Sequence, residues 1–338
     1  MSCGRGMTMT RPMGVERSAL RLPSLISSRL WKIGQALLAI ALVGFAAWYL
    51  WRQWRDASAA HLSLSMNALW LAVASAIVLA TYALLVEAWR RVLARYGHTV
   101  AYRDAARVWF VSNLGKYVPG KVWQVTAMTT MLAALDVPIT AAAGASAVIT
   151  IANVVAGFAL LLVAGGQSLH VVSDKAESAV IISTLILLAA LLVAPFTMRV
   201  ISSAASRLLR REVVIRMPLG AAWISLAGCL VAWLLYGSAF QLLVIAILGR
   251  ASGVWLSYVA AYTLSYLVGY LVLAAPGGLG PREATLSFLL VSLRLATPAE
   301  AAVISIASRL WLTVLEVVPG IAFVLVRRRP WAGPPPVR

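Results

Sequence analysis

Charged residues interrupt an apolar sequence at three places. At each place the residues are of types that could bind an anion. The first is the stretch NLGKYVPGKVWQV, where Lys116 and Lys121 flank Pro119 and Gly120. Proline removes a backbone donor and glycine frees the turn, so this stretch predicts a chain reversal. A helix beginning after Pro119 would direct free N–H groups and its positive dipole end at an anion. Asn113, which opens the stretch, joins these four residues as a candidate ligand. The alternative is that both lysines reach the membrane interface and bind nothing.

The second place is the stretch APGGLGPRE, residues 275–283. Its glycines allow close backbone approach and could form an anion-binding nest. We expect Arg282 and Glu283 to cap the helix that follows. The alternative is a tight turn between two helices. The candidate binding residues here are Gly277, Gly278, Gly280, Arg282 and Glu283.

The third place is the last apolar run, where Arg309, Thr313 and Glu316 share one helical face. Ionisable groups are costly inside a membrane, so they normally face a cavity or a partner. Arg309 and Glu316 are seven residues apart, about 10 Å along a helix, so direct pairing is not expected. We expect each to meet a partner on another element. The alternative is an Arg–Glu network that only locks helices together.

The elements that position these residues are predicted to be membrane-spanning helices. The chain has 338 residues, of which 62% are hydrophobic and 12% charged, and its mean hydropathy is +0.87. This composition predicts an all-α integral membrane protein, a polytopic helical bundle. The apolar runs long enough to cross a bilayer are residues 33–51, 68–88, 139–165, 179–198, 218–248 and 299–326.

The formal charge of +18 lies almost entirely in short flanks of the apolar runs. This is the positive-inside pattern of cytoplasmic loops, and it predicts a multi-pass protein of the cytoplasmic (inner) membrane. Residues 1–32 form a basic N-terminal segment and residues 327–338 an Arg/Pro-rich tail, both predicted to be cytoplasmic. A nucleic-acid partner is not expected, because no soluble domain carries a basic face.

The residue types and motifs give little support for a disulfide framework, a metal site or an enzyme active site. Cys3 and Cys229 are too far apart in sequence to suggest a disulfide framework, and the three histidines lie in separate loops. Nucleotide-binding, serine hydrolase and zinc protease motifs are absent. We therefore expect no metal, no cofactor and no catalytic residue. If the protein were an enzyme, Glu283 and Glu316 would be its only mid-chain candidates for a general base.

Two stretches are predicted to be broken, re-entrant hairpins. Residues 108–135 span 28 positions, whereas two crossings need about 40. Residues 254–296 are broken by the second glycine-rich stretch, although 254–275 alone is long enough to span. The chain then divides into a first repeat, 33–165, and an inverted second repeat, 179–326. AVITIAN (147–153) and AVISIAS (302–308) match at five of seven positions. Two such breaks predict a polar cavity between the halves.

The order and separation of these motifs resemble a known family. NLGKYVPGKVW, then PGGLGPREA, SRLW and VVPG, are similar to the membrane domain of lysylphosphatidylglycerol synthetases, a flippase-like domain. The resemblance covers about residues 68–326 and points to the two Pro-Gly motifs and Arg309. It implies a polytopic protein that moves or presents modified lipids. Two departures matter: no soluble aminoacyl-transferase domain is expected beyond the Arg/Pro-rich tail, and residues 150–153 stand where many relatives have a Glu-Arg pair.

The function predicted from this resemblance and these residues is that of a lipid flippase or translocase that handles an anionic or modified headgroup. The residues favour a transporter over an enzyme. One alternative is a membrane-embedded transferase. Another is an accessory subunit of a glycolipid or envelope-polysaccharide pathway. The predicted partners are membrane lipids, with a lipid-modifying enzyme or a second copy of the chain as further candidates.

Overall fold

The computed structural model describes residues 66–117, 122–164, 218–272 and 280–325, with Gly278 and a few positions between 182 and 193. Several predicted features lie outside the described residues. They are the segment 1–32, the run 33–51, most of the run 179–198, the tail 327–338, and the candidate residues Pro119, Gly120, Lys121 and Gly277.

Four helices in the described part of the chain are long and apolar enough to cross a membrane. They are α2 (Ala68–Arg95), α5 (Ile139–Ala164), α8 (Leu219–Leu248) and α11 (Pro298–Leu325). At 1.5 Å per residue each exceeds the ~30 Å hydrocarbon core of a bilayer. The described residues contain no strand, which confirms the predicted polytopic helical fold.

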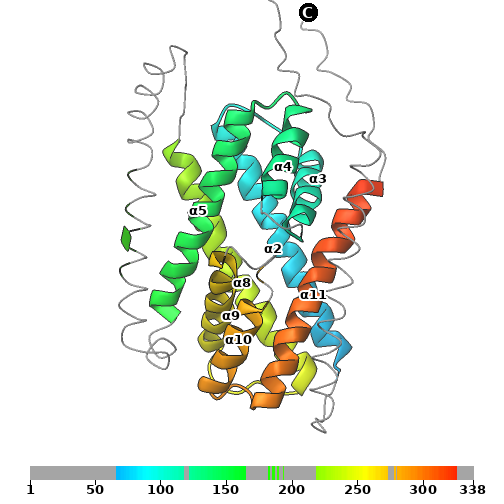
Figure 1. The fold of residues 1–338 in the computed structure, drawn as a ribbon, viewed down its shortest axis with the longest axis vertical. Helices are drawn as coiled ribbons and strands as arrows, with labels where there is room; N and C mark the ends of the chain where they lie inside the picture. Colours follow the sequence, from blue (N-terminus) through cyan, green and yellow to red (C-terminus); the bar gives the residue numbers. More distant parts are fainter. Residues whose placement is uncertain are drawn as a thin grey trace, which may run out of the picture.

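The remaining helices are shorter and come in two pairs. The first pair is α3 (Tyr102–Asn113) and α4 (Val122–Ala133), with the 3₁₀ turn η1 (Leu114–Tyr117) after α3. The second pair is α9 (Trp255–Leu271) and α10 (Pro281–Ser292). Helices of 12 and 17 residues reach about 18 and 25 Å, less than the hydrocarbon core. In Figure 1 the first pair occupies the upper half of the molecule and the second pair the lower half.

Helix α8 runs antiparallel to α2 and parallel to α5. The backbone N–H of Asn67, just before α2, donates to the carbonyl of Ala246 near the end of α8 at 2.9 Å. Near the other end of this helix pair, Gly220 lies against the side chain of Arg95. The indole N–H of Trp233 on α8 donates to the carbonyl of Asn153 on α5 at 2.9 Å. These contacts fix the direction of three of the four long helices.

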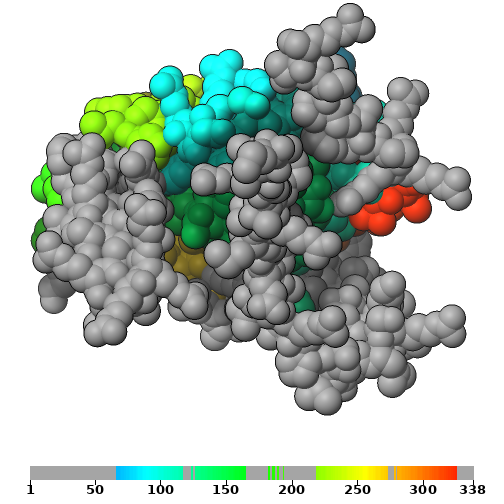
Figure 2. Space-filling model, turned by 90° about the horizontal axis from the view of Figure 1, so that it is seen from above, coloured from blue at the N-terminus to red at the C-terminus, as the bar shows by residue number. Residues whose placement is uncertain are grey.

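The end of α2, the beginnings of α5 and α8, and the end of α11 meet at the upper end of the molecule. Figure 2 looks onto this end, with the cyan segment at the top, the yellow-green segment at the upper left and the red segment at the right. Gly144 of α5 lies against the ring of Tyr96, which follows α2. The pair α3–α4 therefore starts and finishes at this end, because α3 begins after Tyr96 and α4 leads into α5.

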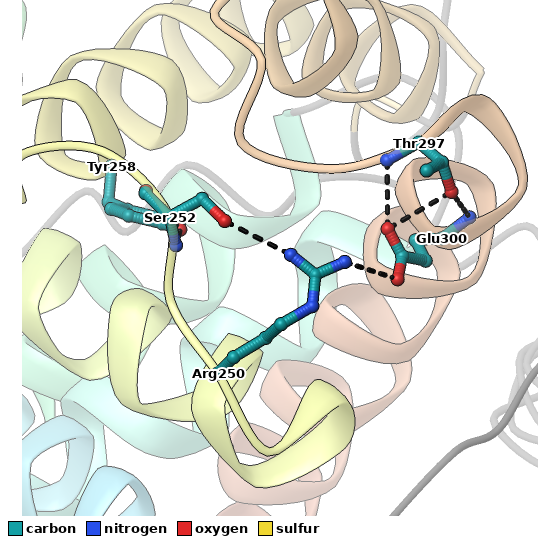
Figure 3. Close-up of polar contacts among 5 residues, drawn as sticks. All are labelled: Arg250, Ser252, Tyr258, Thr297 and Glu300. Carbon is teal, nitrogen blue, oxygen red and sulfur yellow. Dashed lines mark hydrogen bonds and ion pairs between the residues drawn. The ribbon is translucent and has the colours of Figure 1, made fainter.

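The lower end is held by a polar cluster around Arg250, shown in Figure 3. Its guanidinium donates to the hydroxyl of Ser252 at 3.0 Å and to Oε1 of Glu300 at 2.9 Å. Glu300 in turn accepts the backbone N–H of Thr297 at 2.8 Å. Tyr258 fixes the same loop by donating its hydroxyl to the Ser252 carbonyl at 2.8 Å. The cluster ties the end of α8 to the beginning of α11.

The pair α9–α10 also starts and finishes at one end, because Gly253 before α9 lies against Leu295 after α10. The two short pairs thus enter from opposite ends of the molecule. Moreover, α8 runs opposite to its counterpart α2, and α11 runs opposite to its counterpart α5. This is the arrangement that an inverted repeat with two re-entrant hairpins would produce. The repeat and the re-entry into a bilayer stay predictions.

Close helix packing and an apolar exterior complete the fold. On α8, a Cβ at Gly237 would lie 2.6 Å from the Cα of Val259 on α9, so glycine permits this crossing. Exposed apolar side chains cover the outer faces of the long helices, for example Trp223 on α8 and Val314 and Val318 on α11. Such surfaces fit contact with lipid tails, and the chain is a multi-pass membrane protein.

Candidate functional site

The two broken pairs converge on one cavity of about 380 Å³. Asn113 and Lys116 line it from the first break, and Gly278 and Arg282 line it from the second. Every described helix contributes to its wall. This volume lies within the range of small-molecule binding pockets.

The first break is held in place by α4 and α11. The side-chain amide of Gln124 on α4 donates to Oδ1 of Asn113 at 2.5 Å. A Cβ at Gly115 would lie 2.9 Å from the backbone nitrogen of Gln124, so η1 and α4 approach as closely as backbones allow. Leu114 packs against Gly320 of α11, directly after Pro319.

An ion pair joins the first break to α11. The ammonium of Lys116 pairs with Glu316, and these side chains are 25% and 15% exposed. Both residues line the cavity. The structure therefore brings together two candidates that the sequence placed 200 positions apart. It also confirms the expectation that Glu316 meets a partner on another element.

The second break depends on two glycines in the left-handed region. Gly278 has φ +75°, and a Cβ there would lie 2.7 Å from the carbonyl oxygen of Gly269 on α9. Gly280 has φ +91° and precedes α10. Its N–H donates to Oε2 of Glu283 at 2.7 Å, so Glu283 caps the helix as expected. Arg282 does not cap α10, because a guanidinium has no hydrogen-bond acceptor for the free N–H groups at the start of a helix.

Arg282 instead lies in the cavity wall over two tyrosine rings of α9. Its guanidinium carbon is 5.3 Å from the ring centroid of Tyr262 and 4.8 Å from that of Tyr266. The residue is only 5% exposed. Cation–π contacts of this kind offset part of the cost of burying the charge.

A second ion pair links α11 to α10 beside the cavity. Nε of Arg309 is 3.7 Å from Oε1 of Glu283, and both side chains are more than 90% buried. Arg309 thus meets its partner on another element, as expected. Arg309 and Thr313 line the cavity. Glu283 and Gly280 do not, so Glu283 reaches the site only through Arg309.

The charges of the site do not cancel. Lys116, Arg282 and Arg309 are cations, whereas Glu283 and Glu316 are the carboxylates paired with two of them. The described site therefore carries one net positive charge, and it belongs to Arg282. This agrees with the predicted preference for an anion, and the role of each residue in binding stays a prediction.

Much of the cavity wall is aromatic, which the sequence interpretation missed. The lining aromatic residues are Tyr82, Trp89, Trp109, Trp233, Tyr236, Tyr262, Tyr266 and Tyr270. A signal was present: tyrosines recur every four residues from position 258 to 270, which places them on one face of α9. Three of these four line the cavity, and Tyr258 holds the lower loop instead.

Helix α5 contributes neutral polar groups to the cavity wall. Ser146, Thr150 and Asn153 line the cavity from one face of this helix. Thr150 and Asn153 fall in the stretch where the sequence departs from many relatives. The ionic groups of the described site therefore come from η1, α10 and α11.

Comparison with known proteins agrees with this architecture. The model of the family described as the lysylphosphatidylglycerol synthase TM region matches residues 36–320. No curated protein matches the chain. The matched region includes both breaks and every residue of the described cavity. The chain belongs to the lysylphosphatidylglycerol synthase TM region family.

Proposed function

We propose that this protein is a lipid translocase of the cytoplasmic membrane that handles an anionic or modified headgroup in the cavity. The observation that carries the proposal is the convergence of two broken helix pairs, from opposite ends of the molecule, on one ion-lined cavity. Helices interrupted at corresponding positions of two halves form the substrate sites of many transporters. The membership of a lipid-related membrane family supports a lipid as the substrate.

In this proposal the headgroup enters the cavity while the acyl chains stay in the bilayer. Arg282 binds the headgroup anion, and Lys116 is the cationic group of the first break, with Lys121 as the further candidate from the sequence. Rocking of one half against the other exposes the cavity alternately to each side. The pair Lys116–Glu316 joins the first half to the second, so it would report this movement, whereas Glu283–Arg309 lies within the second half.

Reconstitution into proteoliposomes tests the proposal. Tail-labelled phospholipid in the outer leaflet is followed by loss of its accessibility to a membrane-impermeant reductant. We expect wild-type protein to move lipid faster than protein-free vesicles, and Arg282→Gln to slow it. Arg250→Gln is the matched control, because Arg250 lies in the lower polar cluster and does not line the cavity. Equal rates for wild type and empty vesicles would contradict the proposal, and chemical conversion of the lipid would favour the transferase alternative.

A further inference from the structure

Unpartnered polar groups in the cavity wall indicate what kind of ligand would complete it. Among cavity-lining side chains that the structure describes, three buried polar atoms have no hydrogen-bond partner: Nη2 of Arg282, Nε1 of Trp89 and Nε1 of Trp109. All three are N–H donors. Buried polar groups are normally satisfied, so a donor-rich wall calls for a ligand rich in acceptors.

Both carboxylates at or beside the cavity already have a cationic neighbour, although Oε1 of Glu283, which does not line the cavity, accepts no hydrogen bond. Glu316 pairs with Lys116, and Glu283 pairs with Arg309. An ammonium group would have to displace one of these native cations and leave it without its carboxylate. Removing one partner from a buried ion pair is strongly unfavourable.

The aromatic wall could bind a cation in principle, because ring faces attract positive charge. The faces of Tyr262 and Tyr266 are, however, covered by the guanidinium of Arg282. The protein's own cation thus occupies the part of the wall nearest the second break. A second cation placed there would be repelled by the first.

The donors lie at two places along the cavity. Trp89 and Trp109 are neighbours, with ring centroids 5.9 Å apart, on α2 and α3 near the upper end. Arg282 lies at the second break, and tyrosines including Tyr82 and Tyr236 line the wall as well. Tyrosine and tryptophan rings pack against apolar C–H surfaces and offer polar groups at their edges. A polyol suits such a wall, since its carbons can pack on rings while its oxygens accept hydrogen bonds.

We infer that the headgroup is a phosphodiester bearing a hydroxylated group, a glycerol or a sugar, and that the cavity disfavours a cationic aminoacylated headgroup. This inference rests on the proposed function, because it assumes that the headgroup enters this cavity. The phosphate lies against Arg282, and the hydroxyl oxygens accept hydrogen bonds from Trp89 and Trp109. The description of the family names a lipid with a lysylated, cationic headgroup. In this inference the present chain selects an anionic headgroup instead.

Competition between headgroups tests the inference. Full-length protein is reconstituted with tail-labelled phosphatidylglycerol, phosphatidylcholine or lysyl-phosphatidylglycerol of identical acyl chains, and transbilayer rates are compared. We expect phosphatidylglycerol to move at least about tenfold faster than the lysylated lipid, as for one charge-assisted hydrogen bond. Arg282→Gln should remove this preference, Arg282→Lys should keep part of it, and Arg250→Gln should leave it unchanged.

Binding is measured separately, by native mass spectrometry of wild-type protein in mixed micelles containing equal amounts of phosphatidylglycerol and lysyl-phosphatidylglycerol. Enrichment of phosphatidylglycerol on the wild-type protein would support the inference without the need for a variant. Transport of both lipids at equal rates, or equal retention of both, overturns the inference and leaves the proposed function standing. Selective retention of phosphatidylglycerol without transport overturns the proposed function and leaves the ligand class standing.

Discussion

At the scale of single residues, the site depends on where one arginine lies. Arg282 and Glu283 are neighbours in sequence but serve different purposes: Glu283 caps α10, and Arg282 lines the cavity. The helix start separates them, since successive residues of a helix point about 100° apart. The buried cation is offset by tyrosine rings rather than by a carboxylate of its own.

The Lys116–Glu316 pair predicts a stability coupling between η1 and α11. Lys116→Gln and Glu316→Gln should each lower the free energy of unfolding by about 1–2 kcal/mol, because hydrogen bonds to charged groups are worth roughly that and Lys116 is partly exposed. The double variant should lose less than the sum of the two. Thermal unfolding in detergent measures this cycle. Strict additivity would show that the two side chains do not interact.

The glycines of the second break predict different costs for the same substitution. Gly278→Ala should destabilise the protein more than Gly280→Ala. Both residues have positive φ, but only at Gly278 would a Cβ meet backbone, 2.7 Å from the Gly269 carbonyl oxygen, whereas Gly280 has open space around it. Backbone strain costs about 1–3 kcal/mol, and the clash adds to it at Gly278. Thermal unfolding temperatures compare the two, and equal losses would contradict the assigned close approach.

At the scale of elements, hydropathy and length predicted most of what the described residues show. Helices α2, α5, α8 and α11 lie on predicted apolar runs, and both glycine-proline stretches separate short helices. These features follow from local rules for membrane length and helix breaking. Two features depend on tertiary contacts and could not be predicted from the sequence. They are the pairing of Lys116 with Glu316 and the position of the Arg282 side chain in the cavity wall. The tyrosine face of α9 was readable from spacing, although an aromatic stripe in a span also suits lipid contact.

The crossing of α8 and α9 predicts a requirement for glycine at one position. Gly237→Ala would place a Cβ 2.6 Å from the Cα of Val259, and neither backbone can move without shifting a helix. Overpacking of this kind costs about 1–3 kcal/mol. Gly220→Ala on the same helix is the control, because its Cβ would meet only the flexible end of Arg95 at 3.4 Å. A lower unfolding temperature for Gly237→Ala alone is expected, and equal temperatures would contradict this packing.

At the scale of the whole molecule, two halves that run in opposite directions enclose the cavity. The first pair of short helices, α3 and α4, lies in the upper half of the molecule, and the second pair, α9 and α10, lies in the lower half (Figure 1). Described residues beside each break line the cavity, among them Lys116 and Gly278. Polar backbone at such a depth is tolerated only if protein or water satisfies it. Arg90, Arg91 and Arg95 gather at the upper end with α3, which matches the predicted cytoplasmic side.

This arrangement predicts which loops share a side of the membrane. In a chain whose native cysteines are replaced by serine, Thr99→Cys and Ala134→Cys lie on exposed loops before and after the first pair, and Ala251→Cys lies in the lower loop. A membrane-impermeant maleimide applied to spheroplasts should label Ala251→Cys but neither of the other two, which should react only after the membrane is opened. The reason is that α3 and α4 together return the chain to the end where it began, whereas α8 carries it to the opposite end. Labelling of Ala134→Cys but not Thr99→Cys in intact spheroplasts would mean that the first pair crosses the bilayer. The first break would then no longer be a reversal, and the cavity would lose the geometry on which headgroup binding depends.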